Sequence, residues 1–350
     1  MLNNVPLTKL QFRPGIVREL TSYANEGGWF NCDKIRFRFG TPEKLGGWVK
    51  LSLGTYLGSA RALKPFVALD GSHFNGVGTH LKYYIEEGGG YNDITPIRLT
   101  TSAGDVTFSA TNGSSTVTVS DTSHGAIVND FVTFSGAASL GGNITAAVLN
   151  QEYQIASIVN DDSYTIAAKD TSGAAVTANS SDTGNGGSSV VGAYQINVGL
   201  NTTVAGTGWG AGTWSRGTWG SASSLIAVGS TLRLWSHDNF GEDLIINARD
   251  AGIFYWDKST GLTSRAVALS DRAGADSTTP TIAKQVLVSD RDRHVIVFGC
   301  DPENAIGTQD PLLIRFSDQE NPLVWQSLAT NTAGDLRLGS GSEIVTAVET

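Results

Sequence analysis

The sequence is poor in charged residues, in cysteine and in long apolar runs. Charged residues make up 16% of its 350 residues, where about 25% is usual for soluble domains. No apolar stretch approaches the length of a membrane span, so we expect no membrane insertion. The two cysteines, Cys32 and Cys300, do not make a disulfide framework, and we expect both to be buried free thiols. The N-terminus lacks a basic segment followed by an apolar one, which predicts the absence of a signal peptide.

Basic residues are the scarcer sign of charge, and the net charge is -9. This balance argues against a general nucleic-acid binder, because contacts to phosphate need clustered Lys and Arg. It remains compatible with a channel through which DNA slides without binding.

The patterns that mark catalytic, metal and cofactor sites are also missing. The five histidines are isolated, and no HxH, HExxH or CxxC spacing occurs. Gly76-Val77-Gly78 is a lone GxG without the helix that would make it a phosphate cradle. The aspartates between Asp290 and Asp318 lie in turn-like strings, and we interpret them as residues of hairpin turns. The sequence therefore predicts no enzyme activity, no cofactor and no metal site.

Short apolar segments separated by turn residues dominate what is present. Four of them lie between Ala60 and Ile97, and the same order returns from Leu225 to Leu269 and from Lys284 to Leu328. A four-strand unit that recurs at about 40–50 residues is typical of propeller blades. We predict an all-β protein with a β-propeller that is incomplete within this chain, its blades formed by residues 59–98 and 200–350.

The last ten residues, GSEIVTAVET, resemble the opening strand of a fourth blade. We therefore expect this chain to be the N-terminal part of a longer protein or to close its ring in another way.

Residues 99–199 differ in composition from the blades that flank them. They are low in charge and rich in Ser, Thr, Ala and Gly, and they contain about six short β-like segments. Loops tolerate insertions at small free-energy cost. We predict a small inserted β-sandwich or barrel domain here.

Residues 1–58 do not follow the blade pattern, and they form an N-terminal wrapping or docking segment in this prediction. A predicted strand places Ile35, Phe37 and Phe39 on one face and Lys34, Arg36 and Arg38 on the other. Trp29 follows two glycines and is a candidate partner contact. The segment docks on a partner or wraps its own propeller, and we favour wrapping. Arg36 and Arg38 are weaker contact candidates, interpreted as a solvated face rather than a phosphate site.

A further group of candidate contact residues lies in the glycine-rich string GTGWGAGTWSRGTWG. Trp209, Trp214 and Trp219 recur there at intervals of five, which fits neither a helical face nor strand alternation. These indoles anchor an interface, stack on carbohydrate or pack on the propeller surface.

Three strings of the chain carry a resemblance to a known family. The string from Phe12 to Trp48, which begins FRPGIVREL, resembles the opening of tail proteins of podovirus-type phages. These are known as packaged-DNA stabilisation or tail nozzle proteins. Asn112–Gly136 is similar to a small β domain of phage structural proteins, and Asp238–Asp257 also fits the group. The members compared are longer than this chain.

The resemblance implies a virion structural protein of the tail, assembled in the host cytoplasm. It implies a homo-oligomer, a hexameric ring below the portal and its adaptor, with a tail fibre or spike as a further partner. Such a ring retains packaged DNA and conducts it at ejection without sequence recognition. The alternative function is a phage receptor-binding propeller that binds or cleaves carbohydrate, with the three tryptophans stacked on sugar rings.

Overall fold

The computed structural model describes residues 12–21, 23–47, 49–50, 52, 54–182, 184–202 and 232–348. The chain divides into two compact units, residues 1–53 and residues 54–350. The predicted all-β class is confirmed, since the described residues contain one α-helix, α1 (Ala146–Leu149), among antiparallel sheets. Within these residues no helix is both long and apolar enough to cross a membrane.

The smaller unit contains a β-hairpin. Strand β1 (Ile35–Arg38) pairs with β2 (Thr41–Lys44) in antiparallel register. Before the hairpin, the chain bends at Gly15 (φ 95°), and a parallel bridge joins Ile16 to Trp29.

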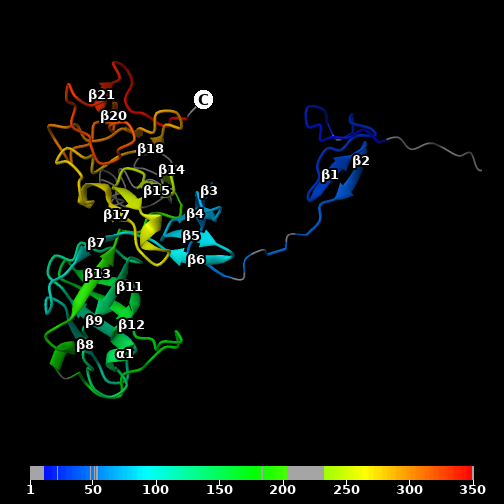
Figure 1. Ribbon diagram of the computed structural model, residues 1–350. Helices are drawn as coiled ribbons and strands as arrows, with labels where there is room; N and C mark the ends of the chain where they lie inside the picture. The colour runs from blue at the N-terminus through cyan, green and yellow to red at the C-terminus, as the bar shows by residue number, and fades with distance from the viewer. Residues whose placement is uncertain are drawn as a thin grey trace, which may run out of the picture. The chain divides into compact units, whose positions relative to one another are not determined.

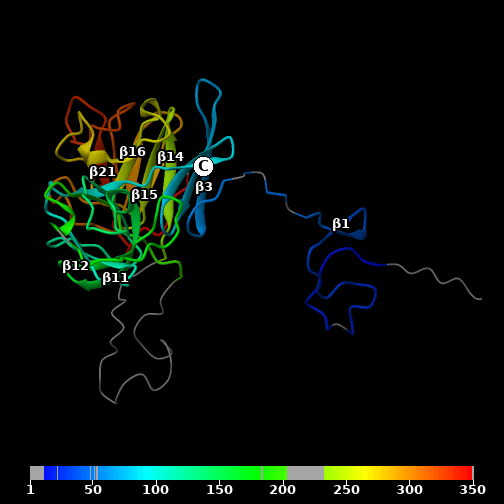
Figure 2. The ribbon, with the colours of Figure 1, turned by 90° about the horizontal axis from the view of Figure 1, so that it is seen from below.

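The larger unit contains three four-stranded antiparallel sheets, each with its strands in chain order. The first sheet consists of β3 (Ala60–Val67), β4 (His73–Thr79), β5 (Tyr83–Glu87) and β6 (Gly90–Asp93). The second consists of β14 (Trp235–Phe240), β15 (Asp243–Ala248), β16 (Ile253–Trp256) and β17 (Val267–Ala268). The third consists of β18 (Gln285–Val288), β19 (Val295–Phe298), β20 (Leu313–Phe316) and β21 (Gly334–Arg337). Figures 1 and 2 show these sheets in succession, from cyan through yellow to red.

Apolar clusters hold the three sheets face to face, with the second sheet in the middle. Phe66 and Phe74 of the first sheet share one cluster with Leu244 of β15. Ile245, the next residue of β15, points the other way into a cluster shared with the third sheet. Successive side chains of a strand point to opposite faces. The unbroken apolar run Leu244–Ile246 therefore reflects a strand that is buried on both sides.

The segment between the first and second sheets forms a seven-stranded antiparallel sheet in the order β7-β13-β10-β11-β12-β9-β8. Its strands are β7 (Ile97–Thr100), β8 (Thr107–Ala110), β9 (Thr116–Ser120), β10 (Phe131–Ser135), β11 (Glu152–Asn160), β12 (Ser163–Ala167) and β13 (Val191–Gln195). Register shifts interrupt the pairing of β11, and such irregularities let a sheet bend. Phe108 and Phe134, from strands far apart in the sheet order, meet with ring centroids 4.9 Å apart. The predicted sandwich or barrel thus takes the form of one open sheet curled around its core.

Two strand predictions were wrong, and a third lies largely outside the described residues. The strand predicted at Leu225–Trp235 includes residues 225–231, which are not among those described, and β14, which starts at Trp235, is the first described strand of the second sheet. The last strand of the third sheet is β21 rather than Leu323–Leu328. Residues 341–350 were predicted as an opening strand, and the described part of that segment, residues 341–348, forms no strand. The domain boundaries at residues 58, 98 and 199 stay predictions. None of the described sheets is closed, and a propeller arrangement is taken up below as a proposal.

Candidate partner contacts and the junctions between sheets

Trp209, Trp214 and Trp219 lie outside the described residues. Their roles in docking, carbohydrate stacking or surface packing therefore stay predictions.

Trp29 packs within the smaller unit. Its ring centroid lies 5.9 Å from that of Phe12 and 6.0 Å from that of Phe37 on β1. The backbone at Trp29 is held by a hydrogen bond, in which the amide of Val17 donates to the Trp29 carbonyl at 2.9 Å. A Cβ at residue 28 would lie 2.2 Å from Oδ1 of Asn25, so a larger residue there would displace the Asn25 side chain. The indole is therefore a packing centre of this unit.

Arg36 and Arg38 are both exposed on β1. Nε of Arg36 donates to Oε1 of Glu43 at 2.8 Å, across the hairpin. The prediction that Phe39 shares one face of this strand with Ile35 and Phe37 is wrong. Strand β1 ends at Arg38, and Phe39 occupies the following turn with φ 50° and 94% of its surface exposed. A role of either arginine in partner contact stays a prediction.

The smaller unit exposes much of its apolar surface. Its exposed large apolar residues are Phe12, Ile16, Val17, Leu20, Tyr23, Phe30, Phe39, Leu45 and Val49. Among the described residues of this unit, only Asn25 is buried. Contiguous exposed apolar patches commonly mark interaction sites.

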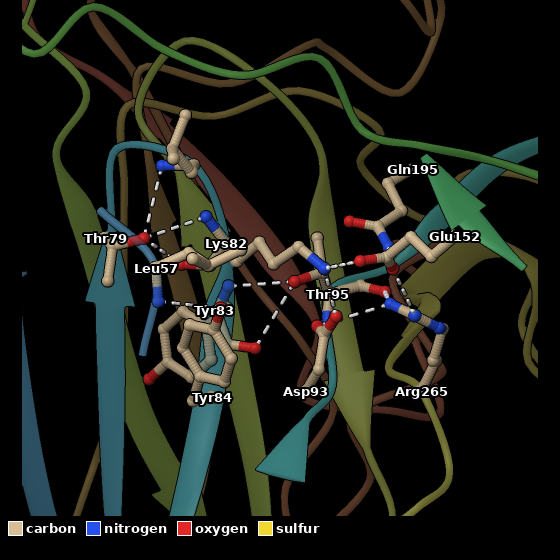
Figure 3. A network of polar contacts seen from close by, with 11 residues as sticks. Leu57, Thr79, Lys82, Tyr83, Tyr84, Asp93, Thr95, Glu152, Gln195 and Arg265 are labelled. Atoms are coloured by element: carbon tan, nitrogen blue, oxygen red, sulfur yellow. Dashed lines mark hydrogen bonds and ion pairs between the residues drawn. The ribbon is translucent and has the colours of Figure 1, made fainter. Parts of the chain in front are cut away.

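An ionic network around one buried lysine joins the first sheet to the seven-stranded sheet (Figure 3). Lys82 is 3% exposed, and its Nζ lies 2.7 Å from Oδ2 of Asp93 and 2.5 Å from Oε1 of Glu152 on β11. Arg265, just before β17, lies 3.3 Å from Asp93 and 3.4 Å from Glu152. Gln195 of β13 donates to Oε2 of Glu152 at 2.6 Å.

The charges in this network balance. Burial acts to raise the pKa of Asp93, but Lys82 and Arg265 outweigh it and lower the pKa. Both carboxylates therefore face a cation, as buried charges require. The sequence reasoning missed this network. The one available signal was a lysine inside the apolar string LKYYI, and nothing in the sequence connects it with Glu152.

Polar side chains of β14 fasten the second sheet to the third. Oγ of Ser236 accepts from the backbone amide of Val286 at 2.9 Å. Oδ2 of Asp238 accepts from the amide of Val288 at 3.0 Å, and its Oδ1 lies 2.6 Å from Nζ of Lys64 on β3. These side chains satisfy amides on the free edge of β18 that no strand pairs. The first strands of the three sheets thereby become neighbours.

Buried aromatic and imidazole groups fasten β14 to the first sheet. The indole Nε1 of Trp235 donates to the Thr79 carbonyl at 2.7 Å. The hydroxyl of Tyr83 lies 2.5 Å from Nδ1 of His237. Burial, assisted by Lys64, lowers the pKa of His237 to about 4. The imidazole is therefore neutral, and Tyr83 donates to it.

Residues 343–348 lie beside β18. The side-chain amide of Gln285 donates to the Ala347 carbonyl at 2.6 Å and accepts from the Ala347 amide at 2.8 Å. The amide of Ile344, a buried residue, donates to the Pro311 carbonyl at 2.9 Å. Side-chain bonds to backbone thus hold this segment beside β18, as they hold β18 beside β14.

A cavity of about 340 Å³ lies between β14, β18 and this segment, with Arg249 and Lys284 in its wall. Both cations already face Asp250, at 4.0 Å and 3.6 Å. Lys284 also pairs with Glu343. The cavity therefore offers little unbalanced positive charge to an anionic ligand.

The turn interpretation of the aspartates holds for Asp290 and Asp292, which lie in the turn between β18 and β19. Asp301 and Asp318 instead accept from backbone amides far along the chain, those of Thr281 and Thr332. No group of three or more metal-ligating side chains occurs among the residues described.

The two cysteines are free, but they differ in burial. Cys300 is buried as predicted, and burial raises the pKa of its thiol to about 12. Cys32 is partly exposed, which corrects the expectation that both would be buried.

Comparisons with known proteins do not assign this chain to a family. No protein-family model and no curated protein matches the sequence. Among solved structures, the chain is similar to an endosialidase of phage phi92, with a TM-score of 0.20 and 14% identity. The match covers 87% of this chain and 41% of that chain, so this chain spans less than half of that protein's length. At this TM-score the likeness supports no conclusion about fold or function.

Proposed function

We propose that the protein is a structural subunit of a phage tail, a nozzle component that acts through its shape. The observation that carries the proposal is that buried charged side chains in the larger unit bond one structural element to another. Arg315 is 1% exposed and donates to the carbonyls of Asp301 and Thr278. Asp130, equally buried, accepts from the amide of Val198, and Lys82 joins two sheets. These groups fix one element to another, as a rigid assembly part requires.

The three sheets are, in this proposal, blades that fan about an axis near their first strands. Strand β14 lies between β3 and β18, which places the three first strands side by side. After β21 the chain crosses to β18, where Gln285 holds Ala347. A crossing from the last strand of one blade to the first-strand position of the next is the connection that a propeller needs.

In the tail, copies of the subunit form a ring, six in number, below the portal and its adaptor. The ring retains packaged DNA and conducts it at ejection without sequence recognition, and a tail fibre or spike docks on it. The net charge of -9 favours passage, because an acidic wall repels phosphate. The proposal further rests on the resemblance of Phe12–Trp48 to nozzle proteins. It includes assembly in the host cytoplasm and no catalytic activity.

Localisation in purified virions tests the proposal. A gold-binding tag is fused to the subunit and virions are imaged by electron microscopy, with a tagged major capsid protein as control. The expected label lies at the tail, between the portal vertex and the distal tip. Label spread over the capsid, or virions that lack the subunit, would refute a nozzle role.

A further inference from the structure

Lys82 and Asp93 lie at the open end of the hairpin formed by β5 and β6. Lys82 directly precedes β5, and Asp93 is the last residue of β6, where it pairs with Tyr84. Nζ of Lys82 lies 2.7 Å from Oδ2 of Asp93. It is therefore no more than about 4 Å from the carbon of that carboxyl group, because a C–O bond is about 1.2 Å long. This separation approaches the distance at which bound groups react, about 3–3.5 Å.

A second carboxylate is positioned to take protons from the amine. Oε1 of Glu152 lies 2.5 Å from Nζ of Lys82, which stands between the carboxyl groups of Glu152 and Asp93 (Figure 3). A general base must lie within hydrogen-bond reach of the proton that it removes. The base is itself held in place, because the side-chain amide of Gln195 donates to Oε2 of Glu152 at 2.6 Å.

The other oxygen of Asp93 faces two fixed donors. Its Oδ1 accepts from the backbone amide of Thr95 at 2.9 Å and lies 3.3 Å from Nη1 of Arg265. Attack of an amine on a carboxyl carbon places negative charge on an oxygen, and donors aimed at that oxygen stabilise the transition state. Thr95 and Arg265 supply such donors at Oδ1. Oδ2, which faces the amine, is therefore the oxygen that departs.

Lys82 is shielded from water, and the charges around it stay balanced if it reacts. Its side chain is 3% exposed, and the ring of Phe131 lies 4.3 Å from its Nζ. The network contains two cations and two carboxylates, so a bond between Lys82 and Asp93 removes one of each. Arg265 and Glu152, 3.4 Å apart, then remain as a pair. The product leaves fewer charges to be buried, and burial of a charge is costly.

We propose that Lys82 and Asp93 condense into an intramolecular amide bond, with Glu152 as the general base. A bond forms between Nζ of Lys82 and Cγ of Asp93, and the bond between Cγ and Oδ2 breaks. Of the three protons of the ammonium group, one stays on the amide nitrogen and two leave with Oδ2 as water. Glu152 carries protons from the nitrogen to the departing oxygen and ends unchanged. Each chain reacts once without turnover, so the inference goes beyond the proposed function and does not depend on it.

Mass spectrometry of the denatured full chain tests the proposal. After the folded protein has stood for several days, we expect the chain to be lighter than its sequence by one water, about 18 Da. Trypsin should no longer cut after Lys82, so residues 62–98 should appear as one peptide that carries this loss.

Three variants assign the roles of the residues. Glu152→Gln keeps the size of the side chain but removes the base, and this variant should keep its full mass and be cut after Lys82. Lys82→Arg should also keep its full mass, because a guanidinium group stays protonated and is not a nucleophile. Lys64→Arg is the control, since Lys64 also pairs with an aspartate, Asp238, at 2.6 Å. It should lose water as the parent does.

Three outcomes would overturn the proposal. The first is a parent chain that keeps its full mass after the incubation, since the four side chains would then form an ion-pair network and nothing more. The second is a loss of water with normal cleavage after Lys82, as a succinimide at Asp70-Gly71 would give. The third is a folded Glu152→Gln variant that becomes cross-linked like the parent. Near-UV circular dichroism of each variant establishes that it is folded. Virion localisation is measured independently, so failure here leaves the tail assignment to its own test.

Discussion

His237 shows at the scale of one residue how the fold constrains protonation. Its imidazole is buried at the junction of the first two sheets, where Tyr83, Lys64 and Asp238 face it. Burial first, and the Lys64 ammonium second, favour the neutral form, while Asp238 acts in the opposite direction. The junction therefore requires a neutral imidazole, whose Nδ1 accepts a hydrogen bond from the Tyr83 hydroxyl. Protonation of His237 would place its positive charge beside that of the Lys64 ammonium.

The stability of the larger unit should fall as the pH falls from 6.5 to 4. The pKa of His237 is about 4 in the folded protein, against an ordinary value of 6.5. Between these values the unfolded chain binds a proton that the folded chain does not. Acidification from pH 6.5 to pH 4 should therefore lower the free energy of unfolding by about 3 kcal/mol through this group.

Urea unfolding at pH 7, 5.5 and 4 measures this loss, with His237→Gln as the comparison. Other groups titrate in both proteins, so the difference between them isolates the imidazole. We expect the variant to be less stable at pH 7 and to lose about 3 kcal/mol less on acidification. Equal losses in both proteins would show that His237 does not carry the effect.

Individual strands were predictable where apolar residues alone decide their burial. DLIINA and GIFYW were predicted as strands, and β15 and β16 occupy them. Strand β14, WSHDNF, was missed because its polar residues Ser236 and Asp238 bond to a neighbouring sheet, so the strand lacks an apolar pattern. Conversely, Leu323–Leu328 looks like a strand. Its Trp325 is buried for another reason, since the amide donates to Asp276 and the ring lies beside Arg315.

The contacts that join one sheet to another were also beyond prediction from local sequence. Lys82 and Glu152 lie 70 positions apart, and Gln285 and Ala347 lie 62 apart. Local periodicity reports which face of a strand is buried, but it does not report which distant polar group a side chain meets. The contact candidates Trp29, Arg36 and Arg38 were chosen for local pattern alone, and the structure shows a packing role for Trp29.

Gln285→Ala should loosen the segment 343–348 without disturbing the third sheet. The substitution removes two hydrogen bonds to Ala347, each worth about 1 kcal/mol. Hydrogen exchange at the Ala347 amide should therefore accelerate about 10-fold or more, while Val297 within β19 keeps its protection. Gln154→Ala, in the seven-stranded sheet, is the control and should leave Ala347 unchanged. Unaltered exchange at Ala347 in Gln285→Ala would mean that other contacts hold the segment.

At the scale of the whole molecule, the larger unit contains two kinds of core. The clusters between the three four-stranded sheets each draw residues from two sheets. The cluster of the seven-stranded sheet is drawn entirely from residues between Val106 and Tyr194. The composition of residues 99–199 predicted a distinct element here. Its ties to the first sheet through Lys82 and Gln195 were beyond the reach of composition.

The seven-stranded sheet should fold without the rest of the chain. A fragment of residues 97–198 retains every member of its core cluster and the pairing of β7 with β13. It loses the Lys82 ion pair, but Glu152 is then open to water. We expect cooperative unfolding with a stability on the order of 5 kcal/mol, monitored by far-UV circular dichroism in urea.

A fragment of residues 232–280, the second sheet alone, is the control and should show no cooperative transition, because both of its faces need neighbouring sheets. If residues 97–198 also lack a transition, their core depends on the adjoining sheets, and the domain division predicted from composition is wrong.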